Sequence, residues 1–286
     1  MSTSSMAAAE MHAPAPVEIK RRKSWMERLL GAHAWLVFLF FYAPIAVLII
    51  FSFNDSRLVN QWTGFSLRWY VKLFQNEEIG LALRNSLIVA TASTIVSTIL
   101  GTLVALGLER FRFRGRGALD STLYLPIIIP DIAMAVMLLL FFVQSSQILA
   151  RVGVHFSLGL TTIILAHIAF NVSFVAVLVR ARLADFDKSL EEAAGDLYAN
   201  EWNTFRFVTL PLIMPGIVGG ALLAFTLSLD DFVVTFFTSG PGSTTLPLRI
   251  YSMVKTGVTP EINALSTLML LASMVLVLTS LAIQRR

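Results

Sequence analysis

The chain has 286 residues, of which 56% are hydrophobic and only 14% are charged, and its formal net charge is +4. A soluble core of this size cannot bury so much apolar surface, so the composition excludes an ordinary soluble globular protein and indicates a membrane protein. The absence of cysteine excludes disulfides, thiolate metal sites and a cysteine nucleophile. The histidines are scattered without metal-ligand spacing, so we expect no catalytic residue and no metal site in this chain.

The N-terminal segment, residues 1–33, is predicted to be a disordered and basic cytoplasmic tail. Its first nineteen residues are rich in Ala, Ser, Met and Pro and show no periodicity, and a run of Lys and Arg follows at 20–23. The apolar run that begins at Ala34 lacks a clear small-residue cleavage site before the polar stretch at Asn54. We therefore interpret this run as an uncleaved first membrane span, not as a secretory signal.

Six apolar runs are long enough to cross about 30 Å of hydrocarbon as helices. They comprise residues 34–53, 86–108, 119–143, 158–179, 212–237 and 262–283. The third and fifth runs contain Pro126, Pro130 and Pro215, which interrupt helical hydrogen bonding and predict kinked spans. The expected fold is an all-α membrane protein in which residues 34–284 form one domain of six transmembrane helices.

The distribution of Lys and Arg predicts the orientation of these spans. Most of the basic residues lie in the N-terminal segment, in the loops at 110–116 and 180–206, and at the C-terminal end, and the alternate loops carry fewer. Because basic loops stay on the cytoplasmic side, both termini are predicted to be cytoplasmic. Topology thus accounts for the basic runs, and no nucleic-acid partner is expected.

The longest predicted cytoplasmic loop, residues 183–211, is polar and helix-prone. Ala-rich and Glu-rich residues 190–197 predict one short helix, and residues 202–210 predict a second that ends at Pro211. Two short helices that meet at a turn can present an apolar ridge to a groove on a partner. This loop is therefore the predicted docking point for a soluble protein.

The same loop resembles the EAA motif of the transmembrane subunits of ABC importers. The residues that match the motif in register are Glu192, Ala193, Ala194, Leu210 and Pro211. Val208 conservatively replaces an isoleucine of the family pattern. The resemblance implies that these five residues couple the chain to an ATPase.

One position of this loop departs from the family pattern, because Tyr198 stands where the motif has glycine. That glycine is explained by a turn with positive φ, which costs a residue with a β-carbon about 1–2 kcal/mol. Asn tolerates this conformation better than most residues, and Asn200 lies two positions further on. We therefore predict that the turn has moved to Asn200.

Carboxylates inside the apolar runs suggest a cationic cargo. Asp131 lies within the third run, and Asp230 and Asp231 lie late in the fifth. A charge within a spanning helix costs about 2.5–3.5 kcal/mol on insertion scales, so it usually faces a cavity or a partner. On the fourth run, His167, Asn171 and Phe174 share one helical face that could line the same path.

Each of these side chains also has a purely structural interpretation. Asp131 follows a proline and can cap a restarted helix. Asp230 and Asp231 can sit at an interfacial helix end or pair with Arg249 or Lys255. A histidine in this position is more often a packed, hydrogen-bonded residue than a ligand. The sequence leaves both interpretations open.

A wider resemblance connects the chain to the polyamine branch of the ABC importer permeases. The stretches that carry it include residues 52–54, 62–70, 111–115, 130–132 and, above all, 228–267. They look most like the second permease of spermidine/putrescine systems, and the likeness covers about 34–284. It implies a type I importer permease fold in a bacterial inner membrane, with cargo moved by alternating access.

The resemblance also implies the partners. They are a homologous permease subunit, two cytoplasmic ABC ATPase subunits that bind ATP and magnesium, and a periplasmic binding protein that delivers a polyamine. The sequence has no G-x-x-x-x-G-K-[ST] phosphate loop, so ATP hydrolysis is assigned to another chain and no cofactor to this one.

Two alternative functions remain in view. One is an importer permease for another small solute, such as an anion or a metal ion, since the EAA motif alone would allow it. Acidic membrane residues argue against an anion, and the lack of a ligand cluster argues against a transition metal. The other is a secondary transporter or a membrane scaffold, but no internal duplication is visible. Putrescine and spermidine are not distinguished.

Overall fold

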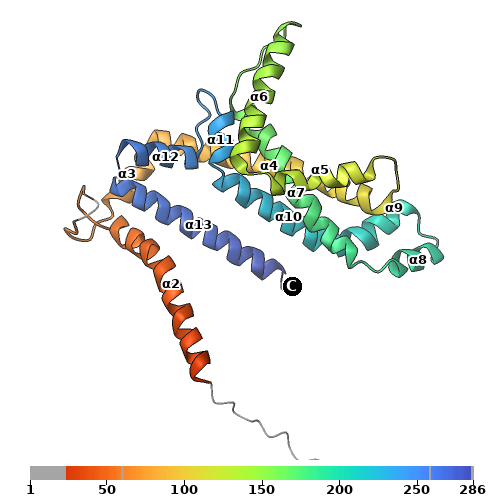
Figure 1. Ribbon diagram of the computed structural model, residues 1–286, viewed down its shortest axis with the longest axis horizontal. Coiled ribbons are helices and arrows are strands. Elements are labelled where there is room, and N and C mark those ends of the chain that lie inside the picture. The colour runs from red at the N-terminus through yellow and green to blue at the C-terminus, as the bar shows by residue number, and fades with distance from the viewer. Residues whose placement is uncertain (1–23, 59–60, 258, 285–286) are drawn as a thin grey trace, which may run out of the picture. The chain divides into compact units, whose positions relative to one another are not determined.

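The computed structural model describes residues 24–58, 61–257 and 259–284. Within these ranges the regular structure is helical, apart from one isolated antiparallel bridge between Asn54 and Phe65. The helices in Figure 1 are α2 (Trp25–Ser52), α3 (Arg68–Gln75), α4 (Glu77–Arg110), α5 (Arg116–Ile128), α6 (Asp131–Ala150), α7 (Leu160–Ala184), α8 (Ser189–Asp196), α9 (Glu201–Thr204), α10 (Leu210–Asp230), α11 (Val233–Thr238), α12 (Leu246–Thr256) and α13 (Pro260–Gln284). The all-α prediction is confirmed.

Helices long and apolar enough to cross a membrane occupy the predicted runs. In the part of the chain that the structure describes there are five: α2, α4, α6, α7 and residues Glu201–Asp230, which include α10. The sixth run is also helical, as α13, and is apolar over Pro260–Val275. The chain is thus a multi-pass membrane protein.

The described residues near the N-terminus differ from the structure predicted for them. The expected disordered tail at 1–19 lies outside the described residues. Helix α2 already begins at Trp25, before the predicted start at Ala34. Of the described residues, those up to Val47 belong to one compact unit and those from Leu48 onward belong to another. The α2 side chains of the first unit are apolar and mostly exposed, as expected for a helix that needs lipid or a protein partner.

The third predicted span at 119–143 is broken into two helices, not only kinked as predicted. Helix α5 ends at Ile128, Ile129 and Pro130 are extended, and α6 begins at Asp131. Proline removes one backbone donor and disfavours helical geometry at the residue before it, so the helix stops here and restarts. The fifth run is also divided, since α10 ends at Asp230 and α11 begins at Val233.

Three long helices, α4, α7 and α10, pack pairwise and form the centre of the second unit (Figure 1). Their shared core includes Ala105 and Leu108 of α4, Val175 of α7, and Ile213 and Ala224 of α10. Small residues allow the helix axes to approach closely, which is how membrane helices gain packing energy without a hydrophobic driving force.

Gly101 of α4 lies at a tight contact between α4 and α7. A β-carbon at this position would lie 2.7 Å from the Val175 Cβ and 2.9 Å from the Val172 carbonyl oxygen. We therefore expect Gly101→Ala to lower the thermal unfolding temperature of the purified protein, since overpacking a tight contact costs about 1–3 kcal/mol.

Gly107 provides a matched control on the same helix, because a β-carbon there meets nothing within 4 Å. Gly107→Ala should leave the unfolding temperature unchanged or raise it, since alanine favours helix more than glycine does. Equal unfolding temperatures for the two variants would show that α4 and α7 are not in tight contact at Gly101.

Two further apolar clusters hold the shorter helices in place. One joins α3 and α12 to the start of α4 and to α13, and it includes Trp69, Leu246 and Leu265. The other joins α6, α7 and α11 and includes Phe142 and Val234. The second cluster includes Val234 of α11, with Leu227 of α10 packed against it, and so lies on both sides of the α10–α11 break, where the acidic pair lies.

Candidate functional site

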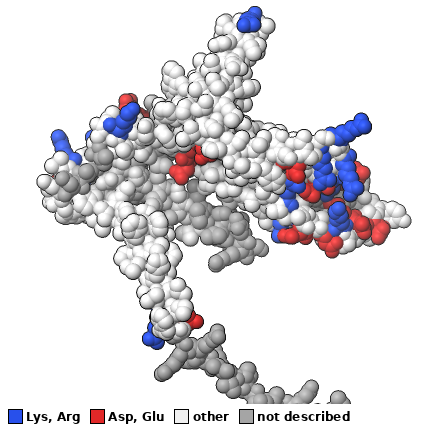
Figure 2. Space-filling view, viewed as in Figure 1, with Lys and Arg blue, Asp and Glu red and all other residues white. Residues whose placement is uncertain are grey.

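Helices α8 and α9 and the π-helical turn η2 (Phe205–Thr209) form a short helical hairpin, which we call the knob (residues 189–209). Figure 2 shows that, on the face in view, most charged side chains gather at the end that carries α8 and α9. The backbone amide of Ser189 donates to the Asp187 carboxylate at 2.9 Å, and this hydrogen bond lowers the Asp187 pKa. The predicted pair of short helices is thus present.

The second knob helix does not end at Pro211 as predicted. Helix α9 continues through η2 into α10, and Pro211 occupies one of the first positions of α10. In the π-helical turn η2, the Leu210 amide donates a hydrogen bond to the Phe205 carbonyl oxygen. Proline lacks an amide donor and disturbs regular α-helical pitch, and the π turn just before Pro211 takes up this local change. Movements of the knob can therefore pass directly into a spanning helix.

A partly exposed ion pair attaches the knob to the central helices. Arg110, at the end of α4, donates to Glu191 of α8 and, at 3.1 Å, to the Thr209 hydroxyl. Thr209 in turn donates to Glu191. Glu192, one of the predicted ATPase-coupling residues, is exposed, whereas Glu191, which makes these contacts, was not singled out from the sequence. Adjacent glutamates look alike in sequence, and only the helix phase shows which one faces α4.

The opposite side of the knob exposes large apolar side chains. Leu197, Tyr198 and Trp202 are 82%, 98% and 64% exposed. Ala193 is exposed as well, whereas Ala194 is half-buried. Exposed apolar residues grouped on a polar segment mark a protein-interaction surface. Of the other predicted coupling residues, Leu210 is half-buried and Pro211 is exposed.

The structure overturns the predicted shift of the tight turn to Asn200. Tyr198 has φ +60°, and it is the only described residue other than glycine with positive φ. Asn200 has φ −75° and ψ 164° and caps α9, because its side chain accepts from the Asn203 amide at 2.8 Å. The turn therefore stays at the family's glycine position, and tyrosine bears the strain.

Replacing Tyr198 separates backbone strain from side-chain contact. Tyr198→Gly should relieve about 1 kcal/mol of strain in the knob and so slow its proteolysis in the purified protein. Asn200→Ala should have the opposite effect, because the lost helix cap costs about 1 kcal/mol. Faster proteolysis of Tyr198→Gly than of the wild type would argue against a strained turn.

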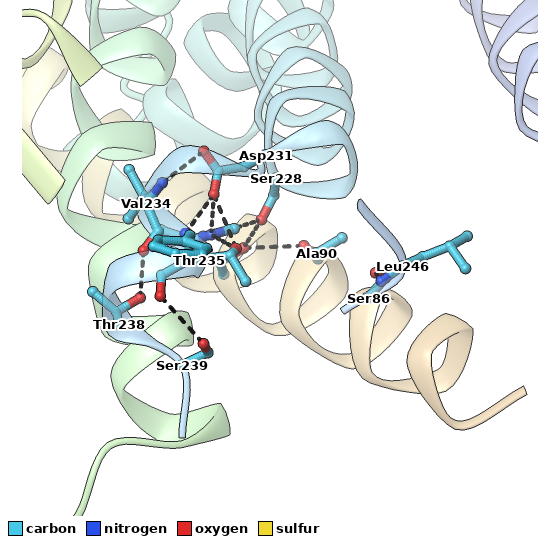
Figure 3. Close-up of polar contacts among 12 residues, drawn as sticks. Ser86, Ala90, Ser228, Asp231, Val234, Thr235, Thr238, Ser239 and Leu246 are labelled. Carbon is cyan, nitrogen blue, oxygen red and sulfur yellow. Dashed lines mark hydrogen bonds and ion pairs between the residues drawn. The ribbon is translucent and has the colours of Figure 1, made fainter. Parts of the chain in front are cut away.

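The acidic pair lies at the break between α10 and α11, and its two members have different surroundings. Asp231 points toward α11, where it accepts from the Thr235 amide at 2.8 Å, the Thr235 hydroxyl at 2.9 Å and the Val234 amide at 3.3 Å (Figure 3). A carboxylate that caps the start of a helix is stabilised both by hydrogen bonds and by the helix dipole. Neither Arg249 nor Lys255 is its partner in the contacts described here.

His167 of α7 completes a buried polar network around Asp231. Its Nδ1 lies against the Ser228 hydroxyl, and its Nε2 lies 3.1 Å from the Thr235 hydroxyl and 3.3 Å from Asp231 Oδ2. Ser228 also contacts Ser93 of α4 at 2.8 Å. Both ring nitrogens are thus engaged by protein groups, and the network joins α4, α7, α10 and α11.

The other two residues of the predicted α7 face differ from His167. Asn171 is fully buried, and neither its amide nitrogen nor its carbonyl oxygen has a hydrogen-bond partner among the described residues. Phe174 is half-buried and packs against the cluster that joins α6, α7 and α11. A buried amide without a partner is costly, so Asn171 is a natural place for a water or a polar ligand.

Asp230 and Asp131 are exposed, and the helix dipole affects them differently. Asp131 lies in the first turn of α6, where a negative charge is favoured. Asp230 is the last residue of α10, where a negative charge is disfavoured. In the described part of the chain, no hydrogen bond or ion pair reaches the Asp230 carboxylate. The hydrogen bonds and the histidine contact that explain the position of Asp231 therefore have no counterpart at Asp230.

Asp230 opens onto a cavity of about 440 Å³ between α10, α12 and α13. The other lining residues are mainly apolar and aromatic: Phe232, Pro247, Ile250, Tyr251, Val254, Ser266 and Met269. The aromatic residues were not singled out from the sequence. Phe232 follows the acidic pair directly in the chain, whereas Tyr251 lies on α12, and nothing in the sequence marks Tyr251 as a neighbour of Asp230.

Comparison with known proteins agrees with this architecture. Residues 97–286 match the family described as binding-protein-dependent transport system inner membrane component. The putrescine transport system permease protein PotI of Escherichia coli (strain K12) is 46% identical over 236 residues, which is 82% of this chain and 83% of that protein. The spermidine/putrescine transport system permease protein PotC of Haemophilus influenzae is 43% identical over 258 residues, 90% of this chain and 97% of that protein.

A solved structure shares the fold. It is a bacterial ABC transporter involved in import of the acidic polysaccharide alginate, and the match has a TM-score of 0.75 at 21% identity, covering 92% of this chain and 96% of that chain. The predicted ABC importer permease fold is confirmed. This chain belongs to the family of binding-protein-dependent transport system inner membrane components.

Proposed function

We propose that the chain is a permease subunit of an ATP-driven importer of putrescine or spermidine. The observation that carries the proposal is Asp230, a carboxylate without an ion-pair partner among the described residues, at the end of a spanning helix and open to a cavity. Such a charge is costly in a membrane protein, and an ammonium ion in transit would offset the cost. The relatives PotI and PotC, named for putrescine and spermidine/putrescine, support the same cargo.

The remaining acidic and polar residues have different roles in this proposal. Asp131 provides a second exposed carboxylate, and Asn171 a buried polar contact, along the path. Asp231 and His167 hold the α10–α11 break in shape through their mutual network. Phe174 packs beside this network. The path itself is completed by a homologous permease subunit.

The knob is the proposed attachment site for the ATPase. Its exposed apolar residues would fit a groove on one of two cytoplasmic ABC ATPase subunits, and the unbroken connection through η2 to α10 would transmit ATPase closure to the spans. A periplasmic binding protein would deliver the polyamine, consistent with the family's description. In this arrangement both termini lie in the cytoplasm and the complex spans a bacterial inner membrane.

Copurification of the complete complex tests the proposal. The chain is expressed with its homologous permease, the ATPase and the binding protein, and ATP hydrolysis is measured with putrescine, spermidine, an oxyanion such as molybdate, or Zn²⁺. We expect the polyamines to stimulate hydrolysis and the anion and metal to have no effect. Stimulation by the anion or the metal alone would favour the alternative of an importer permease for another small solute.

A further inference from the structure

Three aromatic rings form a cluster, and two of them line the same cavity as Asp230. The Phe232 ring centroid lies 4.6 Å from that of Tyr251 and 5.6 Å from that of Phe236, and the Phe236 and Tyr251 centroids are 6.3 Å apart. Phe232 and Tyr251 line the cavity with Asp230. Tyr251 and Phe236 are 45% and 48% exposed, so the cluster is not buried in the core of this chain.

The rest of the cavity wall is aliphatic. Ile250 and Val254 of α12 and Met269 of α13 line it, and Asp230 is the only charged residue among the lining residues described. Arg249 of α12 is paired with Glu78, and Lys72 is paired with Glu261. Lys255 of α12 has no described ion pair and is not among the residues that line the cavity, so none of the described cations is paired with Asp230.

We propose that Asp230, Phe232 and Tyr251 form a binding site for one ammonium group of the polyamine, with the aliphatic wall in contact with its methylene chain. This inference rests on the proposed function and names residues that would select the cargo. A carboxylate pairs with an ammonium group by a charge-assisted hydrogen bond. The negative face of an aromatic ring attracts the same cation.

The composition of the cavity also limits what it can hold. Its single carboxylate binds one ammonium at a time, so the second ammonium of a diamine must point out of the open cavity toward another acceptor. An anion would meet uncompensated repulsion from Asp230, and a hydrated metal ion would find only one ligand. A polyamine carries methylene chains between separated charges. It therefore matches a cavity whose wall combines one carboxylate, aromatic rings and aliphatic side chains.

Variants at Tyr251 in the complete complex test the aromatic part of the site. Radiolabelled putrescine uptake is measured in proteoliposomes with saturating binding protein. Tyr251→Leu should lower the initial rate about threefold to tenfold, and Tyr251→Phe, which keeps the ring, should stay within about twofold of the wild type. Phe141→Leu is the matched control, since Phe141 is an exposed phenylalanine on α6 that does not line this cavity.

Fluorination distinguishes cation binding from packing and remains decisive if Tyr251→Leu does not assemble. With phenylalanine or trifluorophenylalanine at position 251, the shape is nearly the same but fluorine withdraws the negative charge from the ring face. We expect the fluorinated ring to lower uptake about threefold relative to phenylalanine at the same position. In the Asp230→Asn background, the fluorinated and unfluorinated variants should have the same uptake rate.

The outcomes separate this inference from the proposed function. If the wild-type complex imports putrescine but fluorination at position 251 has no effect, the aromatic site is overturned and the polyamine function stands. If the wild-type complex transports an anion or a metal ion and no polyamine, both are overturned.

Discussion

Asp230→Asn is expected to reduce polyamine uptake by about tenfold or more while leaving the complex assembled, because the exchange keeps size and removes charge. Asp230 lies at the C-terminal end of α10 and has no described partner that would lose a contact. Removing its charge should even relieve an unfavourable interaction with the helix dipole. A loss of transport together with unchanged or higher stability would indicate a functional carboxylate.

The measurement is radiolabelled putrescine uptake together with copurification of the partner subunits. Asp131→Asn serves as the comparison and should lower uptake less, since the dipole of α6 already favours a carboxylate there and asparagine also caps helices well. The double variant should be at least as impaired as Asp230→Asn. Near-normal uptake in the double variant would remove the structural argument for a cationic cargo.

Glu191→Ala is expected to uncouple transport from ATP hydrolysis. Glu191 ties α8 to the end of α4 through Arg110 and to η2 through Thr209. Without it, Arg110 loses its carboxylate and the knob can move without moving the spans, so uptake should fall by about fivefold or more. The ATPase should still copurify, because the exposed apolar surface at Leu197 and Trp202 is unchanged.

The control for this prediction is Asp196→Asn, an exchange at an exposed carboxylate on the same helix. It should leave both ATPase association and uptake near the wild-type values. Arg110→Ala should reproduce the effect of Glu191→Ala, and the double variant should be no worse than either single one, since all three remove the same interaction. Additive losses would mean that the two residues act separately.

The sequence alone determined the class of protein and the positions of most of its spans, but not the breaks in the third and fifth runs. Hydropathy is a local property, so the apolar runs found at 158–179 and 262–283 correspond to α7 and α13 with small shifts at their ends. The EAA resemblance likewise depends on residues close together in the chain. The glycine position of that motif kept its backbone conformation even though Tyr198 occupies it, because the two knob helices need a tight turn there.

Only the tertiary structure decided what each polar residue contacts. Asp230 and Asp231 are chemically identical neighbours, yet the α10–α11 break turns one toward His167 and α11 and the other toward a cavity. Glu191 and Glu192 differ only by one step of helix phase, which directs one of them to Arg110. Tyr251 of α12 reaches Phe232 at the α10–α11 break although the two residues lie on separate elements of the chain. Such contacts depend on how distant helices pack, and local sequence patterns carry no record of that packing.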